Sequence, residues 1–155
     1  MVIEKLQRQD LFALLTPKEV ERLSSASGVV KLKKGEKVYS EGLPASHFFV
    51  LVKGKVELRR PAEGNLNLLV DDIPEGGIFG VSSLAQGERY LLNAECVEDS
   101  DVLKVESRVL RAILDENPAA GYAFERRISQ IFFKRYVEAM ERLRSVVRVV
   151  ALGLA

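Results

Sequence analysis

The sequence is poor in the residues that build disulfide frameworks and metal centres. Its 155 residues include one cysteine, Cys96, and one histidine, His47. A single cysteine excludes an internal disulfide and any cysteine-rich zinc or iron–sulfur site. A single histidine argues against a multi-histidine metal centre and against a Cys–His catalytic pair.

The chain also lacks a long apolar run and an excess of charge of either sign. No run approaches the roughly 18 residues of a membrane span, and the first residues do not resemble a signal peptide. Lys and Arg number 23 against 22 for Asp and Glu, and the net charge of +1 argues against a strongly basic nucleic-acid-binding surface. We expect a soluble, cytoplasmic domain.

The composition that remains is that of a folded domain. Hydrophobic residues make up 47% of the chain and charged residues 29%, which permits a packed core and argues against general disorder. The length suits one domain, since domains usually contain roughly 100–200 residues.

The first residues carry a helix signal, and the middle of the chain carries strand signals. Residues 16–19 (TPKE) form a capping box with proline at the first helical position. Residues 48–52 are an unbroken apolar run, which predicts a strand buried on both faces. Residues 62–65 predict a hairpin turn. Short strands at this spacing favour a sandwich or barrel over a parallel sheet.

The end of the chain is predicted to be helical. Ser107 is expected to cap a short helix, and Asn117 with Pro118 opens a much longer one. The longer helix carries a heptad seam with 3-4-3-4-3 spacing, made of Phe133, Tyr136, Met140, Leu143, Val147 and Val150.

A second apolar face on the same helix contains Phe124, Ile128, Ile131 and Phe132. The whole helix could lie on its own core. We favour a homodimer through the heptad seam, because a helix with two apolar faces needs two partners.

Several segments in this order resemble a known family. They are residues 35–42 (GEKVYSEG), 48–56 (FFVLVKGKV), 63–64 and 74–80 (PEGGIFG), followed by the long helix. The chain resembles cyclic-nucleotide-binding domains of the catabolite-activator and fumarate–nitrate-regulator type. The resemblance implies a mainly β fold with flanking helices: an eight-stranded jelly-roll β-roll followed by a long C-terminal dimerisation helix.

The resemblance also implies a ligand site in a phosphate-binding cassette at residues 79–90. In the family, a glycine and a short helix N-terminus approach the ligand, a glutamate binds the ribose hydroxyl and an arginine pairs with the phosphate. The candidate ligand-binding residues are Gly80, Val81, Ser82, Ser83, Arg89 and Tyr90.

Two positions in this cassette depart from the family pattern. Val81 stands in the place of the glutamate, and valine cannot accept a hydrogen bond from a ribose hydroxyl. Arg89 lies near the place of the arginine, but counting back from residues 93–96 puts Tyr90 at the phosphate position. We therefore expect the fold without strong cyclic AMP binding, and we assign no other cofactor.

Other candidates have two interpretations each. Arg89 is either a solvated loop charge or an anion-binding group, and Ser82 and Ser83 either contact ligand or cap the short helix. His47 could be a haem ligand, as in some relatives that sense diatomic gases, but an ordinary turn position is favoured. Cys96 is expected to be a small buried hydrophobe.

Two residues of the long helix have roles that can coexist. Tyr136 and Met140 could roof the ligand pocket, because the resemblance places that helix above it. They equally serve the dimer seam.

The resulting expectation is one domain with three parts. Residues 1–28 form a helical segment, residues 29–106 the β-roll, and residues 107–155 a short helix plus the dimerisation helix, with no DNA-binding domain. The apolar last residues favour a sensor cut from a longer regulator over a stand-alone module.

The predicted function is a non-enzymatic sensor for a small-molecule effector in transcription regulation. This chain alone is expected to bind neither DNA nor membrane. The alternatives are a dimeric interaction module that has lost cyclic-nucleotide binding and a sensor of another effector. No paired carboxylates with a nucleophile, metal-ligand cluster or Walker-type phosphate loop occurs in the sequence.

Overall fold

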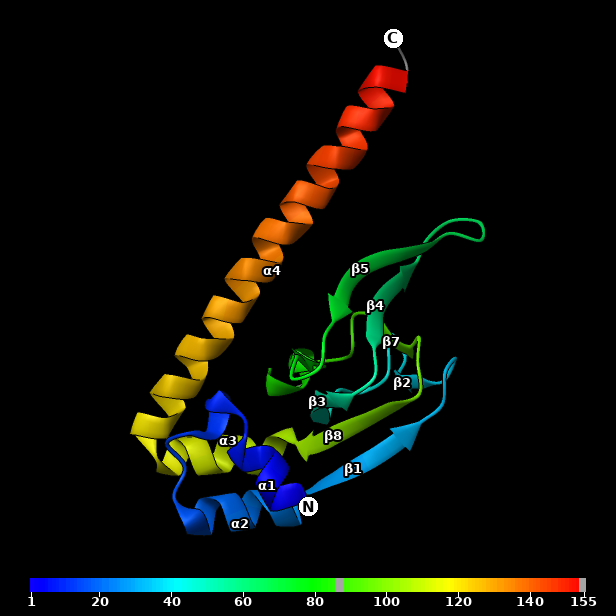
Figure 1. Ribbon diagram of the computed structural model, residues 1–155. Helices are drawn as coiled ribbons and strands as arrows, with labels where there is room; N and C mark the ends of the chain where they lie inside the picture. Colours follow the sequence, from blue (N-terminus) through cyan, green and yellow to red (C-terminus); the bar gives the residue numbers. More distant parts are fainter. Residues whose placement is uncertain (86–87, 154–155) are drawn as a thin grey trace.

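Two four-stranded antiparallel sheets form the centre of the molecule (Figure 1). The computed structural model describes residues 1–85 and 88–153. The strand orders are β1-β8-β3-β6 and β2-β7-β4-β5. These strands and the long helix after them confirm the predicted fold class. The strands are β1 (Ser27–Leu32), β2 (Lys37–Tyr39), β3 (His47–Lys53), β4 (Val56–Pro61), β5 (Asn67–Ile73), β6 (Ile78–Phe79), β7 (Asn93–Cys96) and β8 (Ser100–Glu106).

Strand β3 belongs to two hydrophobic cores, as its unbroken apolar run predicted. Successive side chains of a strand point to opposite faces. Phe48 and Val50 therefore pack into a core shared with the helices, and Phe49 and Leu51 pack into the core between the two sheets. All four side chains are buried.

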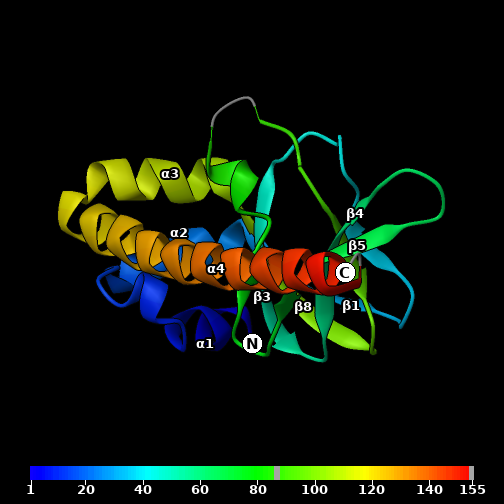
Figure 2. The same cartoon turned by 90° about the horizontal axis from the view of Figure 1, so that it is seen from above.

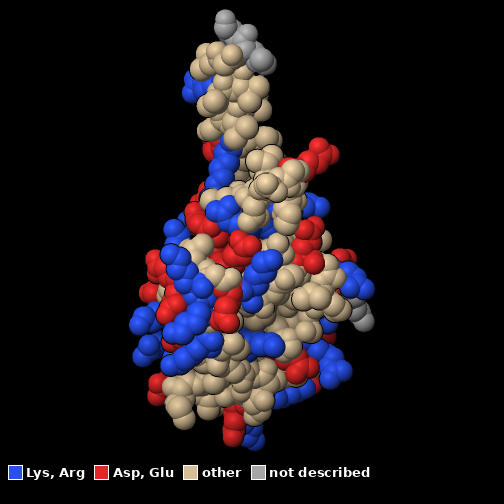
Figure 3. All heavy atoms as spheres, turned by 90° about the vertical axis from the view of Figure 1, so that its right-hand side faces the viewer, with Lys and Arg blue, Asp and Glu red and all other residues tan. Residues whose placement is uncertain are grey.

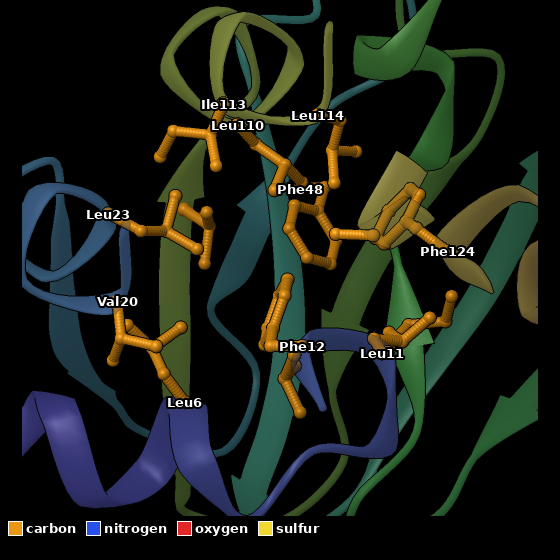
Figure 4. Close-up of a cluster of buried hydrophobic side chains, with 14 of the residues drawn as sticks. Leu6, Leu11, Phe12, Val20, Leu23, Phe48, Leu110, Ile113, Leu114 and Phe124 are labelled. Atoms are coloured by element: carbon orange, nitrogen blue, oxygen red, sulfur yellow. The ribbon is translucent and has the colours of Figure 1, made fainter. Parts of the chain in front are cut away.

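Four α-helices and two short 3-10 helices complete the described elements, and side chains from most of them pack with β3 and β8 in one core (Figure 4). Leu6, Phe12 and Leu23 from the start of the chain meet Leu110 and Phe124 from its end in the core beneath them. The elements are α1 (Val2–Gln7), η1 (Asp10–Phe12), α2 (Pro17–Ser25), η2 (Val81–Leu84), α3 (Ser107–Glu116) and α4 (Pro118–Gly153).

Polar caps fix where the helices begin. The capping box before α2 is confirmed, with the Glu19 N–H donating to the Thr16 hydroxyl oxygen. Asn117 caps α4 by accepting from the Ala120 N–H at 3.2 Å. The expected cap at Ser107 is wrong: Ser107 is the first residue of α3, and its hydroxyl instead bonds inward to another serine.

Helix α4 packs on the body at its start and then projects away from it (Figures 1 and 2). Ala120, Phe124 and Ile128 are its buried residues. The projecting end shows mainly uncharged surface (Figure 3), including Val146, Val149 and Val150 among the exposed hydrophobics. Within the described residues, none of the helices combines the length and hydropathy that crossing a membrane requires.

Candidate functional site

A cavity of about 460 Å³ lies between the β-roll, the short helix η2 and α4. Its walls combine strand, cassette and helix residues, and most of the lining side chains are apolar. The lining residues are Tyr39, Leu58, Val70, Asp71, Gly80, Val81, Ser82, Leu91, Leu92, Phe132, Arg135, Tyr136 and Ala139. This volume falls within the ~300–1,000 Å³ range of small-molecule sites.

Gly80 sets the position of η2 against the β-roll. Its φ of +73° lies in the left-handed region, which side chains other than glycine rarely adopt. A Cβ atom at this position would lie 2.8 Å from the Phe49 ring. Glycine therefore lets the chain turn directly above the buried aromatic residues and bring Val81 and Ser82 into the cavity wall.

One ion pair holds α4 to strand β5 beside this cavity. The Arg135 Nε lies 3.1 Å from the Asp71 Oδ2, and both side chains are largely buried. The Arg135 Nη2 also donates to the Ile78 carbonyl. Two helical turns further along α4, Arg142 donates to the Val70 carbonyl and lies 4.0 Å from the other Asp71 oxygen.

Burial opposes the charge on both members of this pair. It raises the pKa of the Asp71 carboxyl above its ordinary value, and the neighbouring Arg135 lowers that pKa only in part. It also lowers the pKa of the Arg135 guanidinium. Desolvation thus outweighs the mutual attraction for each group, so the pair fixes geometry more than it adds stability.

Tyr90, a candidate ligand residue, packs under the cassette and not in the cavity wall. Its ring stacks on Tyr39 with the centroids 3.9 Å apart, and its hydroxyl donates to the His47 carbonyl. Burial raises the pKa of both tyrosine hydroxyls above the ordinary value. The stacked rings of Tyr39 and Tyr90 are therefore neutral, and the Tyr39 ring lies next to Gly80.

The other predicted site residues divide into two groups. Gly80, Val81, Ser82 and Tyr136 line the cavity together, whereas Ser83, Arg89 and Met140 are not among its lining residues. Gln86 and Gly87 of the cassette lie outside the described residues.

Ser83 and Arg89 make internal contacts. Ser83 is buried and accepts a 2.6 Å hydrogen bond from the Ser107 hydroxyl, which ties η2 to α3. The exposed Arg89 donates to the Gly42 carbonyl at 2.7 Å. The cassette arginine thus contacts backbone on the outside of the cavity.

Two charged residues line the cavity that the sequence did not predict as site residues, Asp71 and Arg135. A signal for Arg135 was present, because the body-facing positions of the long helix, Ile128 and Phe132, continue onto it at helical spacing. A cation on an inward apolar stripe requires a partner. No pattern in the sequence marked Asp71 as a partner of Arg135, because which helix residue lies opposite a strand residue depends on the fold.

His47 is the first residue of β3 and not part of a turn as expected, and Cys96 is the last residue of β7. The His47 Nδ1 lies 2.8 Å from the Ser46 hydroxyl, and burial lowers the pKa of its ring. Cys96 is buried in the core between the sheets, as expected. In the part of the chain that the structure describes, no three His, Cys, Asp or Glu residues gather as metal ligands.

A second cavity, of about 540 Å³, lies on the other side of the ion pair. Asp71 and Arg135 line it as well, together with charged residues of both signs such as Arg8, Glu75 and Lys134. The charges of its described lining residues largely balance. The ion pair thus separates a polar cavity from an apolar one.

Comparisons with known proteins agree with this architecture. The family model for the cyclic nucleotide-binding domain matches residues 29–117. The anaerobic regulatory protein of Bacillus subtilis is 28% identical over 105 residues, which are 67% of this chain and 44% of that protein. A CRP-like cAMP-activated global transcriptional regulator of Mycobacterium tuberculosis is 25% identical over 116 residues, 74% of this chain and 51% of that protein.

A solved structure shows the same fold over most of the chain. The sensor domain of the transcriptional regulator DNR from Pseudomonas aeruginosa superposes with a TM-score of 0.75 at 24% identity, covering 87% of this chain and 91% of that one. The chain spans about half or less of the length of the curated relatives it matches.

Arg135→Met tests how the ion pair contributes to the fold. It leaves the Asp71 carboxylate partly buried without its main partner, which should lower the free energy of unfolding by about 1–3 kcal/mol at neutral pH. Adding Asp71→Asn should recover part of this loss. Urea denaturation measures both, with Lys134→Met as the exposed neighbouring control.

The loss should also depend on pH. The pKa of Asp71 is higher in the folded protein than in the unfolded chain, so ionisation of this carboxyl lowers the free energy of unfolding. This loss of stability is complete above the folded-state pKa and absent below the ordinary value of 3.8. The effect of Arg135→Met should therefore shrink as the pH falls toward about 4. A loss that is independent of pH, with no recovery in the double variant, would contradict this assignment.

Proposed function

Since the chain belongs to the cyclic nucleotide-binding domain family, we propose that it is the effector-binding and dimerisation part of a transcription regulator. The relatives named above are regulators, which supports a sensing role over an enzymatic one. One observation carries the proposal: the cassette residues Val81 and Ser82 share a cavity wall with Phe132 and Tyr136 of α4. A ligand in this cavity touches the helix that leaves the body.

The mechanism we propose is a shift between two arrangements of α4. A ligand changes such an equilibrium only through its difference in affinity for the two states. Here that difference arises because the cavity includes residues of α4 itself, so moving the helix changes the ligand's contacts. Tyr136 links the two events, since it lines the cavity and belongs to the heptad seam.

The proposed partner of α4 is a second copy of the same helix. The six seam residues are all exposed in the single chain, with exposed fractions between 51% and 69%. A contiguous apolar stripe of this size is typical of an interface. The two copies would bury these side chains against each other as in a coiled coil. The seam consists of Phe133, Tyr136, Met140, Leu143, Val147 and Val150.

We propose that Gly80, Val81 and Ser82 contact the effector, together with Tyr136. Ser83, Arg89 and Tyr90 would act indirectly, by holding the cassette in place through the contacts described above. Met140 would belong to the dimer seam. With its charge nearly balanced, this chain alone is not expected to bind DNA specifically.

Leu143→Asp tests the dimer. A carboxylate in the middle of the seam would be buried without a partner, so the protein should become monomeric in light scattering while circular dichroism shows the β-roll still folded. Ser145→Asp adds the same charge outside the seam and should leave the dimer intact. Equal molecular masses for the two variants would contradict the proposed interface.

Val81→Glu tests the cassette. Cyclic AMP should bind the unaltered chain weakly or not at all, because a ribose hydroxyl against Val81 loses a water partner and gains none, at about 1–3 kcal/mol. Restoring the acceptor should improve binding by roughly tenfold to a hundredfold in calorimetry, and Val81→Leu should not. Tight cyclic AMP binding by the unaltered chain would show that the nucleotide site is intact.

A further inference from the structure

The apolar cavity contains one cation whose donors are not all used. Among the described residues that line it, Arg135 is the only lysine or arginine. A guanidinium has five N–H donors. The Nε lies 3.1 Å from Asp71 and the Nη2 donates to Ile78, while no hydrogen bond among the described residues uses Nη1.

This free nitrogen remains accessible. No buried side-chain nitrogen or oxygen of the described residues lacks a hydrogen-bond partner, so Nη1 cannot be both buried and unpaired. Arg135 lines both cavities, so its side chain borders the space beside α4. The Phe132 ring, whose centroid lies 6.0 Å from the Arg135 Cζ, is the neighbouring apolar wall.

The rest of the wall disfavours a strongly polar ligand. Leu58, Val70, Leu92 and Phe132 present apolar surface to the cavity, and Ser82 is the one aliphatic hydroxyl among its described residues. A sugar or nucleotide would bury several hydroxyl groups there without partners, at a cost of about 1–3 kcal/mol for each. A hydrocarbon body would instead gain from leaving water.

We propose that the effector is a small organic acid with an apolar body, whose carboxylate pairs with Arg135. The inference rests on the proposed function and specifies the ligand chemistry of that same cavity. Asp71 is then an internal competitor, because its carboxylate already pairs with the Nε of the guanidinium whose charge the incoming carboxylate shares through Nη1. Since Asp71 lies on β5 and Arg135 on α4, exchange of one carboxylate for the other would loosen the contact between strand and helix.

The energetics of the ion pair support this exchange. Burial disfavours the charge on both Asp71 and Arg135, so desolvation offsets part of the attraction within the internal pair. A carboxylate on an apolar body gains hydrophobic contacts in addition to the charge-assisted hydrogen bond. The ligand therefore has a source of free energy that the Asp71 side chain lacks.

Matched acids and alcohols test the proposal by calorimetry on the full chain. The probes are 4-phenylbutyrate and octanoate, with 4-phenylbutan-1-ol and octan-1-ol as neutral counterparts; the pairs separate aromatic from aliphatic bodies. Each acid that fits should bind about tenfold or more tightly than its alcohol, the size of one charge-assisted hydrogen bond.

Three variants identify the residues that cause the preference for acids over alcohols. Arg135→Gln should abolish it while leaving alcohol binding. Asp71→Asn keeps the guanidinium and removes its competitor, so it should tighten acid binding by several-fold, and circular dichroism checks that each variant folds. Lys134→Gln, which removes a neighbouring cation outside the apolar cavity, should change nothing.

Equal affinities for acids and alcohols would overturn the proposal and leave the sensing function standing, because the cavity would still take apolar ligands. Acid binding that is the same in Arg135→Gln and the unaltered chain would also overturn it. Failure of all four probes to bind would overturn it too, while the dimer test with Leu143→Asp judges the proposed function separately.

Discussion

The ion pair between Asp71 and Arg135 joins α4 to strand β5 of the β-roll. The fully buried residues of α4 end at Ile128, and beyond it Arg135 and Arg142 make the polar contacts to strand β5 among the described residues. Buried apolar contacts fix the start of the helix regardless of ligand. Two arginines on one aspartate hold the following part of the helix as far as Arg142, and charged contacts of this kind can be exchanged for others.

The same pair also determines the chemistry of the cavities beside it. On one side lie charges of both signs, and on the other side lie apolar walls that include the cassette residue Val81. In this cassette the position expected for a phosphate partner holds Tyr90, whose ring is stacked on Tyr39. The cavity's cation comes instead from α4, so recognition of an anion and the position of the helix depend on one side chain.

Local signals in the sequence predicted the fold well, because they depend on residues close in the chain. The Thr16 capping box, the doubly buried strand at residues 48–52 and the Asn117 cap are each properties of a few consecutive residues. The site was predicted in part. Gly80, Val81 and Ser82 line the cavity, but the pairing of Asp71 with Arg135 spans 64 positions and depends on where β5 meets α4. The prediction that Ser107 caps α3 was wrong for the same reason, because its hydrogen-bond partner Ser83 is distant in sequence.

The central claim is that an apolar acid displaces Asp71 from Arg135. Nuclear magnetic resonance can observe both groups directly, through the Nε–H correlation of Arg135 and the carboxyl ¹³C resonance of Asp71, during a titration with 4-phenylbutyrate. The account predicts that both resonances move together as the acid is added and that 4-phenylbutan-1-ol leaves the Asp71 carboxyl unchanged. An Asp71 resonance that stays fixed while the acid saturates the cavity would contradict it.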